Sequence, residues 1–241
     1  MQPALYVALS AQVALANRLE TVASNVANMN TAGYRADEIK FHEIVSRTGP
    51  DPVAFASEGS RYISRQSGAV IETGNPLDIA VEGDAWIGVD IGDSIAYTKD
   101  GRMQIDAQGV LRDLAGNAVL STGGAPIVLD PEAGDPQIAP DGTVTQGDLL
   151  VGNIAVFSID PAARLERSVG SAVVTDLPGQ PILEFTDVAL RQGYVEGANV
   201  NPVREMTKLI MITRAFESAS NLIETSERSQ ATAIRELGEV S

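Results

Sequence analysis

The stretch SNVANMNTAGYR, residues 24–35, closes a long apolar segment at the start of the chain. It holds three asparagines, Asn25, Asn28 and Asn30, followed by Gly33. Asparagine is unfavourable inside a helix, because its side-chain amide competes for backbone hydrogen bonds. A glycine permits the left-handed conformation that often ends a helix. We therefore predict that a helix finishes within this stretch and that the chain then turns away.

The residues before this stretch have the spacing of an amphipathic helix. Apolar or small side chains recur in alternating steps of four and three, which is the pattern of a coiled-coil seam. The predicted seam is Leu5, Leu9, Gln12, Ala16, Leu19, Ala23 and Val26, flanked by Leu15 and Val22. The sequence thus predicts an N-terminal axial helix over residues 1–30.

A second axial helix is predicted over residues 201–241. Asn201 can cap its start, Pro202 suits the first helical position, and Glu205 favours the positive end of the helix dipole. Steps of three and four then connect Leu209, Ile212, Phe216, Ala219 and Ile223.

The middle of the chain has a different pattern. Short β-rich runs alternate with Gly, Asp and Pro, and the Asp-Gly pairs at 100–101 and 141–142 are hairpin signals. We predict a central antiparallel β domain over 77–183, a loop-rich linker region over 31–76 and a return linker over 184–200. The predicted fold class is α+β, with the terminal helices paired as coiled-coil arms.

Charge and composition exclude several classes of function. The 241 residues carry a net charge of −15, so nucleic acid and anionic lipid surfaces would repel the chain. Residues 41–200 hold nearly all of this charge. There is no cysteine, which excludes disulfides. We expect no cleavable signal peptide and no membrane-spanning segment.

Candidate catalytic groups are few. His42 is the only histidine, which with the absence of cysteine excludes the usual zinc sites. Asp141 and Asp148 lie in PDGTVTQGD, where hairpin turns explain them better than calcium or glycosidase chemistry. Trp86 lies in an apolar strand pattern and is interpreted as a core residue. We predict no enzyme activity, no catalytic residue, no cofactor and no metal.

Four segments resemble the bacterial flagellar rod and hook protein family. The resemblance covers most of the chain in the family's order, with departures at Ser24, Val26, Ala85, Trp86 and Ile87. The segments are ASNVANMNTAGYR (23–35), TGNPLDIAVEGDAWIGV (73–89), YTKDGRMQIDAQGVLRDLAGNAVL (97–120) and LRQGYVEGANVNPVREMTKLIMITRAFESASNLIET (190–225).

This resemblance implies a structural subunit of the flagellar basal-body rod, most similar to the proximal-rod members. Such a subunit polymerises helically through its terminal helices and transmits torque from motor to hook. Its implied partners are other copies, related rod proteins and, during secretion, the flagellar type III export apparatus. The implied location is the periplasm, without insertion in the membrane. A distal-rod or hook-type axial protein is the alternative within the family. A periplasmic carbohydrate-binding or hydrolytic β domain is the alternative outside it.

The resemblance also gives the asparagines a predicted role. Asn25 and Asn28 share one helix face, and buried asparagines in a bundle of copies fix register. A polar helix end with ordinary turn residues is the alternative for Asn28 and Asn30. The predicted subunit-packing residues are Leu5, Leu9, Ala16, Leu19, Ala23, Asn25, Val26, Asn28, Asn30, Gly33, Asn199, Asn201, Glu205, Leu209, Ile212, Phe216, Ala219 and Ile223.

Overall fold

The computed structural model of the chain describes residues 2–40, 43–46, 53–56 and 59–238. The chain divides into two compact units, which are treated separately below. We call Met1–Ala27, Asp37–Tyr62 and Asn201–Ser241 the helical unit, and Asn28–Ala36 and Ile63–Val200 the β unit. His42 lies outside the described residues.

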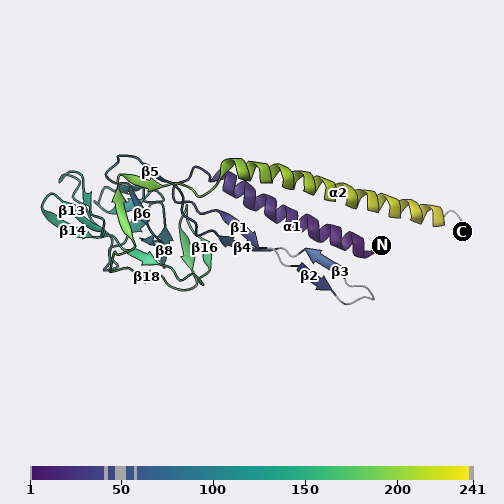
Figure 1. Ribbon diagram of the computed structural model, residues 1–241, viewed down its shortest axis with the longest axis horizontal. Coiled ribbons are helices and arrows are strands. Elements are labelled where there is room, and N and C mark those ends of the chain that lie inside the picture. Colours follow the sequence, from purple (N-terminus) through teal and green to yellow (C-terminus); the bar gives the residue numbers. More distant parts are fainter. Residues whose placement is uncertain (1, 41–42, 47–52, 57–58, 239–241) are drawn as a thin grey trace. The chain divides into compact units, whose positions relative to one another are not determined.

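The helical unit contains the two terminal helices, α1 (Gln2–Ala27) and α2 (Pro202–Gly238). They lie side by side in Figure 1, with the start of α1 beside the last part of α2. Gln12 donates a hydrogen bond to the Ser220 hydroxyl at 3.1 Å, whereas Asn25, later in α1, contacts Glu205, earlier in α2, so the two helices run antiparallel. The helices predicted at both ends of the chain are therefore present, whereas their coiled-coil packing stays a prediction.

Four short strands complete the helical unit. β2 (Glu43–Ser46) pairs antiparallel with β3 (Val53–Ala56), and β1 (Asp37–Lys40) pairs with β4 (Ser60–Ile63). Helix α1 contacts both β1 and β3.

The largest sheet of the β unit has the order β16-β17-β8-β7-β11-β10-β9, with β15 beside β7 and β18 beside β15. Its pairs are antiparallel. Its strands are β7 (Trp86–Asp90), β8 (Ile95–Thr98), β9 (Met103–Ile105), β10 (Leu111–Asp113), β11 (Ala118–Val119), β15 (Val156–Ser158), β16 (Leu165–Arg167), β17 (Val173–Thr175) and β18 (Gln180–Pro181).

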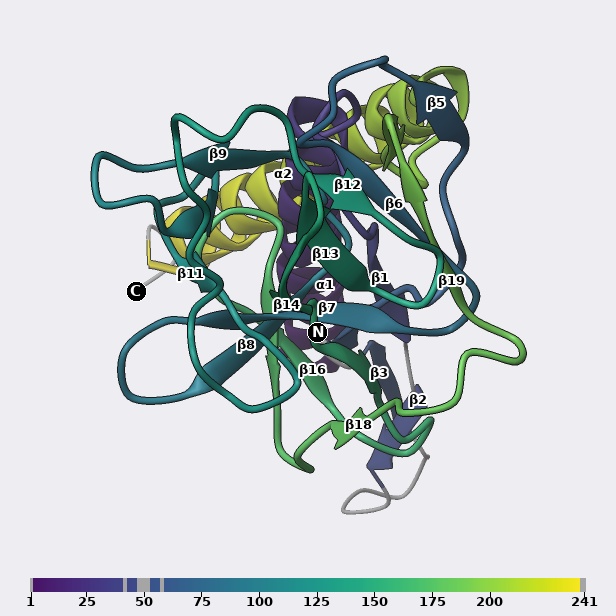
Figure 2. The same cartoon turned by 90° about the vertical axis from the view of Figure 1, so that its left-hand side faces the viewer.

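Three smaller sheets join this one. The strands β12 (Gln137–Ile138), β13 (Thr143–Gln146) and β14 (Leu149–Asn153) form an antiparallel meander. Two pairs connect distant parts of the chain: β6 (Ile79–Glu82) with β19 (Ala189–Gln192), and β5 (Val70–Glu72) with β20 (Tyr194–Glu196). Figure 2 shows β6 and β19 side by side.

The core of the β unit consists of aliphatic side chains from these strands, because alternate residues of a strand point to one face of the sheet. The largest cluster includes Ile79, Ile87, Val89, Leu111, Val119, Val144, Ile154 and Val156. Trp86 is 1 % exposed in a second cluster with Tyr97, Phe157 and Val173. The interpretation of Trp86 as a core residue is confirmed.

One of the two predicted hairpins is wrong. The Asp141–Gly142 turn joins the paired strands β12 and β13, and Gly142 has a φ of +82°. At 100–101, however, β8 and β9 do not pair with each other. Gly101 is needed for a different reason: a Cβ there would lie 1.7 Å from the Ile79 carbonyl oxygen. The glycine permits close approach of two backbone segments rather than a tight turn.

The α+β class and the antiparallel β domain are confirmed by these elements. Strands also occur in the segments 31–76 and 184–200, for which the sequence predicted linkers. The division of the chain into functional domains stays a prediction. The described helices include none that is both long enough and apolar enough to span a bilayer.

Candidate assembly surface

The side chains of α2 separate into an inner face and an exposed face. Glu205 and Ile212 are buried, and Leu209, Phe216, Ala219 and Ile223 are half-buried on the same face. Val203, Met206 and Ile210 are exposed and follow each other in steps of three and four. At about 100° per residue they lie on the opposite side of the helix. The sequence-predicted seam of α2 is thus its inner face, and a second apolar face remains on the outside.

The side chains of α1 also separate into a buried and an exposed face, but the predicted seam residues of α1 are half-buried or exposed. Its buried positions are Ala14, Thr21, Val22 and Asn25. Of the predicted seam, Leu19 and Val26 are half-buried, and Leu9, Ala16 and Ala23 are exposed. The side chain of Leu5 lies outside the described ones.

Together with Val13 and Ala27, these exposed residues form an outer stripe on α1. Leu9 is 49 % exposed and Val13 is 40 % exposed. The stripe consists of Leu9, Val13, Ala16, Ala23 and Ala27, in steps of three, four or seven, and therefore lies along one face. Small residues along such a face permit close approach of another backbone. We call this set the outer stripe of α1, and Val203, Met206 and Ile210 the outer stripe of α2.

Asn25 makes its contacts inside the helical unit. Its Nδ2 donates to the Asp37 carbonyl oxygen at 2.9 Å, and its Oδ1 accepts from the Asp37 backbone N–H at 2.8 Å. Nδ2 also lies 3.5 Å from Oε2 of buried Glu205. A side-chain amide reproduces here the hydrogen-bond pair of a β bridge, which ties the end of α1 to β1 and to the first turn of α2.

The other asparagines shape turns and helix ends. Asn201 Oδ1 accepts the Arg204 backbone N–H at 3.0 Å, which confirms the predicted N-cap of α2. In the β unit, Asn28 accepts the backbone N–H of Thr31 at its carbonyl oxygen, and Asn30 is exposed. Asn199 accepts the Ala36 N–H at 2.6 Å and donates to the Gln66 carbonyl oxygen at 2.8 Å.

Gly33 requires a glycine for two reasons. Its φ is +66°, and an added Cβ would lie 2.1 Å from the Asp100 backbone nitrogen. Its N–H donates to the Glu196 carbonyl oxygen at 2.7 Å. The turn predicted at Gly33 is therefore packed tightly within the β unit.

A buried charge cluster, which the sequence did not predict, lies next to this turn. Arg35 Nη2 is 2.8 Å from Glu196 Oε1, and Lys99 Nζ is 3.6 Å from Glu196 Oε2. All three side chains are at most 2 % exposed. Both cations also lie within 6 Å of the centre of the Trp86 ring. A charged residue gives no sequence signal of burial, so only the match of Arg35 to the resembled motif could have indicated this cluster.

Burial lowers the pKa values of the two cations in the cluster. Desolvation lowers the pKa of Lys99 to about 8, against the attraction of Glu196, which raises it. Desolvation likewise lowers the pKa of Arg35. Lys99 Nζ donates to the Gly83 carbonyl oxygen at 2.9 Å, which helps to hold the ammonium group in place.

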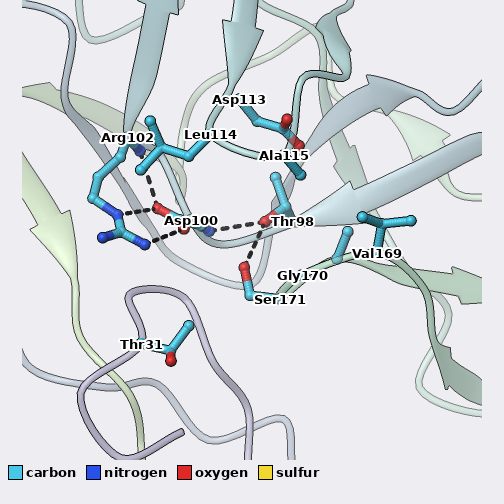
Figure 3. A pocket seen from close by; sticks show the side chains of 11 residues that line it. Thr31, Thr98, Asp100, Arg102, Asp113, Leu114, Ala115, Val169, Gly170 and Ser171 are labelled. Atoms are coloured by element: carbon cyan, nitrogen blue, oxygen red, sulfur yellow. Dashed lines mark hydrogen bonds and ion pairs between the residues drawn. The ribbon is translucent and has the colours of Figure 1, made fainter.

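A cleft of about 200 Å³ opens at one side of the β unit, next to Thr31 (Figure 3). Its walls are the turn after β10, with Leu114 and Ala115, and the turn after β16, with Val169 and Gly170. In it, the Thr98 and Ser171 hydroxyls lie 3.4 Å apart, and Arg102 binds the Asp100 carboxylate with two nitrogens. Its described lining contains no aromatic ring and so does not resemble a carbohydrate site. Among the described residues no acidic or histidine cluster can hold a metal ion.

Comparisons with known proteins agree on one family. Three family models match: "Flagella basal body rod protein" over 5–35, "Flagellar hook protein FlgE/F/G D1 domain" over 80–146 and "Flagellar basal body rod FlgEFG protein C-terminal" over 191–236. The chain is 46 % identical to the flagellar basal-body rod protein FlgF of Mesorhizobium japonicum, with 100 % of both chains covered. It is 41 % identical to FlgF of Rhizobium meliloti over 99 % of each chain. To the flagellar basal-body rod protein FlgG of Bacillus subtilis it is 28 % identical, over 94 % of this chain and 96 % of that protein.

Proposed function

Since the chain belongs to the family of flagellar basal-body rod proteins, we propose that it joins its neighbours in the rod through the outer stripes of α1 and α2. It is a FlgF-like structural protein of the flagellar basal body. The proposal concerns how such a subunit assembles and what its helices contribute.

The apolar outer stripes carry this proposal. Two packed helices normally hide their apolar residues between them and expose polar ones. Here Leu9 and Val13 on α1, and Val203 and Ile210 on α2, are 40–76 % exposed. Full burial of such a side chain is worth about 1.5–3 kcal/mol. Other copies of the chain and related rod proteins are the partners that would supply this burial.

The way in which the helices transmit force follows from the same contacts. Different patches on the two partners make a head-to-tail contact, which continues into an open helical polymer. In this polymer the terminal helices pack as coiled-coil arms, and their interlocked side chains carry torque from motor to hook. The predicted subunit-packing residues divide into two roles: Leu9, Ala16 and Ala23 contact neighbours, whereas Leu209, Ile212 and Phe216 hold α2 within its own subunit.

Membership of the rod family supports a proposal about the location of the subunit. We place the subunit in the periplasmic part of the basal body, which it reaches through the flagellar type III export apparatus. Its 46 % and 41 % identity to two proteins named FlgF, against 28–30 % to proteins named FlgG, supports the proximal rather than the distal rod. An image of the basal body with this chain labelled would separate the two positions.

The assembly proposal is tested with Leu9→Lys on the outer stripe of α1. Lysine is a good helix former, so the helix itself is preserved. Leu177→Lys is the matched control, because Leu177 is 45 % exposed in the β unit and Leu9 is 49 % exposed in α1. We expect Leu9→Lys to be absent from isolated basal bodies and its cells to be non-motile. Leu177→Lys should assemble and support motility.

A different result from two variants would contradict the assembly proposal. If Leu9→Lys and Ile210→Lys chains both enter basal bodies at wild-type level, the outer stripes are not subunit contacts. Circular dichroism of each purified variant shows whether the helices are retained, so loss of folding is distinguished from loss of assembly.

A further inference from the structure

We propose that the cleft of the β unit receives the outer stripe of α2 from a second copy of this chain. This contact rests on the proposed function, because it requires that copies assemble, but it names a specific pair of surfaces. It would be a head-to-tail contact, since the cleft and the stripe are different parts of the chain.

The two turns that form the cleft carry unusual residues for their positions. Turn tips normally hold Gly, Asn, Asp, Ser or Pro, for conformational reasons. Leu114 is 53 % exposed at one tip, and Val169 is 55 % exposed at the other. Figure 3 shows both side chains at the cleft together with Ala115. Neither side chain is needed for the turn itself, and both would become buried against a bound partner.

The outer stripe of α2 has matching chemistry. Val203 is 76 % exposed, Met206 45 % and Ile210 55 %. These are aliphatic side chains of different lengths, and methionine adapts well to irregular cavities. A cleft of about 200 Å³ accommodates the ends of such side chains rather than a whole helix.

Charge favours the same pairing. The β unit contains 8 basic and 20 acidic residues, a net charge of −12 by count of its two segments. Residues 201–216 contain three basic residues, Arg204, Lys208 and Arg214, against Glu205 alone, which gives +2. The one acidic side chain is buried and ion-paired with Lys208, so Arg204 and Arg214 are the charges that face solvent. An acidic unit and a basic helix start attract each other across a subunit contact.

The lining of the cleft includes two carboxylates, of Asp100 and of the 8 % exposed Asp113. The Asp100 carboxylate is already paired with Arg102. The Asp113 carboxylate accepts hydrogen bonds from Asn117, without a cation within 4 Å among the described residues. Arg214 continues the stripe one turn beyond Ile210, so a second copy would bring a cation next to its aliphatic side chains.

The chain is well suited to a direct test, since it contains no cysteine. A double variant, Val169→Cys with Met206→Cys, has one thiol at the cleft and one on the stripe. After oxidation of isolated basal bodies we expect a ladder of disulfide-linked oligomers, because each copy binds one neighbour through each thiol. Each single variant should give no ladder.

A matched control defines specificity. Leu183 is 77 % exposed in the β unit and does not line the cleft. Leu183→Cys with Met206→Cys should give no ladder. A ladder of equal yield from this control, or a disulfide within one chain in place of the ladder, would overturn the cleft contact. Dimers from Met206→Cys alone would show that α2 meets α2 instead.

A second variant covers the case in which the double variant does not assemble. Leu114→Lys should be lost from basal bodies, whereas Leu183→Lys should be retained. If Leu114→Lys assembles normally, the cleft proposal fails while the rod function stands. If the wild-type chain itself is absent from basal bodies, the proposed function fails.

Discussion

The side chain of Asn25 and the backbone of Asp37 exchange two hydrogen bonds, of 2.9 Å and 2.8 Å. Asn25 is 3 % exposed, and its amide also lies next to Glu205. Three segments of the helical unit therefore meet at one amide group: the end of α1, the start of β1 and the first turn of α2. These contacts of Asn25 lie within its own chain, and its predicted subunit-packing role stays a prediction.

The first prediction concerns this amide. Asn25→Asp replaces the donor Nδ2 with an oxygen that would face the Asp37 carbonyl and the Glu205 carboxylate. We expect a loss of unfolding free energy greater than the roughly 1–3 kcal/mol of a deleted buried hydrogen bond. Urea unfolding followed by helical circular dichroism measures it. Asn30→Asp, at an exposed position, should change stability by less than about 0.5 kcal/mol. Equal effects of the two substitutions would contradict the structural role of the Asn25 hydrogen bonds.

The second prediction separates backbone strain from crowding at glycine. Gly33 and Gly74 have similar φ values, +66° and +71°. A Cβ at Gly33 would lie 2.1 Å from the Asp100 nitrogen, whereas a Cβ at Gly74 meets nothing within 4 Å. Gly74→Ala should cost about 1–2 kcal/mol from the left-handed conformation alone. Gly33→Ala should cost clearly more. Thermal unfolding of both variants decides this, and similar melting temperatures would refute the packing argument.

The third prediction follows from the pKa of Lys99. In the folded chain it is about 8, below the ordinary value of 10.5, so the unfolded chain holds the proton more tightly. Folding stability should therefore rise as the pH increases from about 8 to about 10.5, by up to about 3 kcal/mol. Lys99→Met lacks this titration. The difference between the two pH profiles of unfolding free energy should grow across that window, and parallel profiles would exclude the effect. Glu196, Arg35 and Asp84 are the charges that act on Lys99.

The fourth prediction tests the start of α2. Asn201 accepts the Arg204 N–H, as an N-cap does. Asn201→Ala should destabilise the helical unit by about 1 kcal/mol, and Asn201→Asp should be nearly neutral, since both Asn and Asp are good N-caps. Chemical denaturation of the two variants is the measurement. A neutral Asn201→Ala would mean that the cap contributes nothing.

The sequence predicted the elements better than the contacts. Periodicity located both helices, and the caps and inner residues of α2 were as expected. In α1 the predicted seam is divided, because Ala16 and Ala23 are exposed whereas Leu19 and Val26 are half-buried, and the subunit-packing role of these residues stays a prediction. An alanine fits both a buried seam and an exposed small-residue stripe, so the step pattern alone could not orient the helix.

The buried charged residues could not be predicted from the sequence for a related reason. Lys99 stands in YTKDG, which has the composition of a polar turn. It lies next to Trp86 and Glu196 in the folded chain, and Glu196 is 97 positions further along the sequence. The role of Gly101 could not be predicted either. Its Asp-Gly pair is a hairpin signal in the sequence, and only the folded structure shows that Gly101 packs against the Ile79 carbonyl oxygen.

The contacts of residues 35–36 with residues 196–199 have a consequence for the proposed export of the chain. Ala36 donates its N–H to Asn199, 163 positions further along, and Arg35 forms a buried ion pair with Glu196. In the export that we propose, a chain that emerges with its N-terminus first would therefore have no buried partner for Arg35 until Glu196 has also emerged. Folding of the β unit is completed late, since distant segments must meet before it closes.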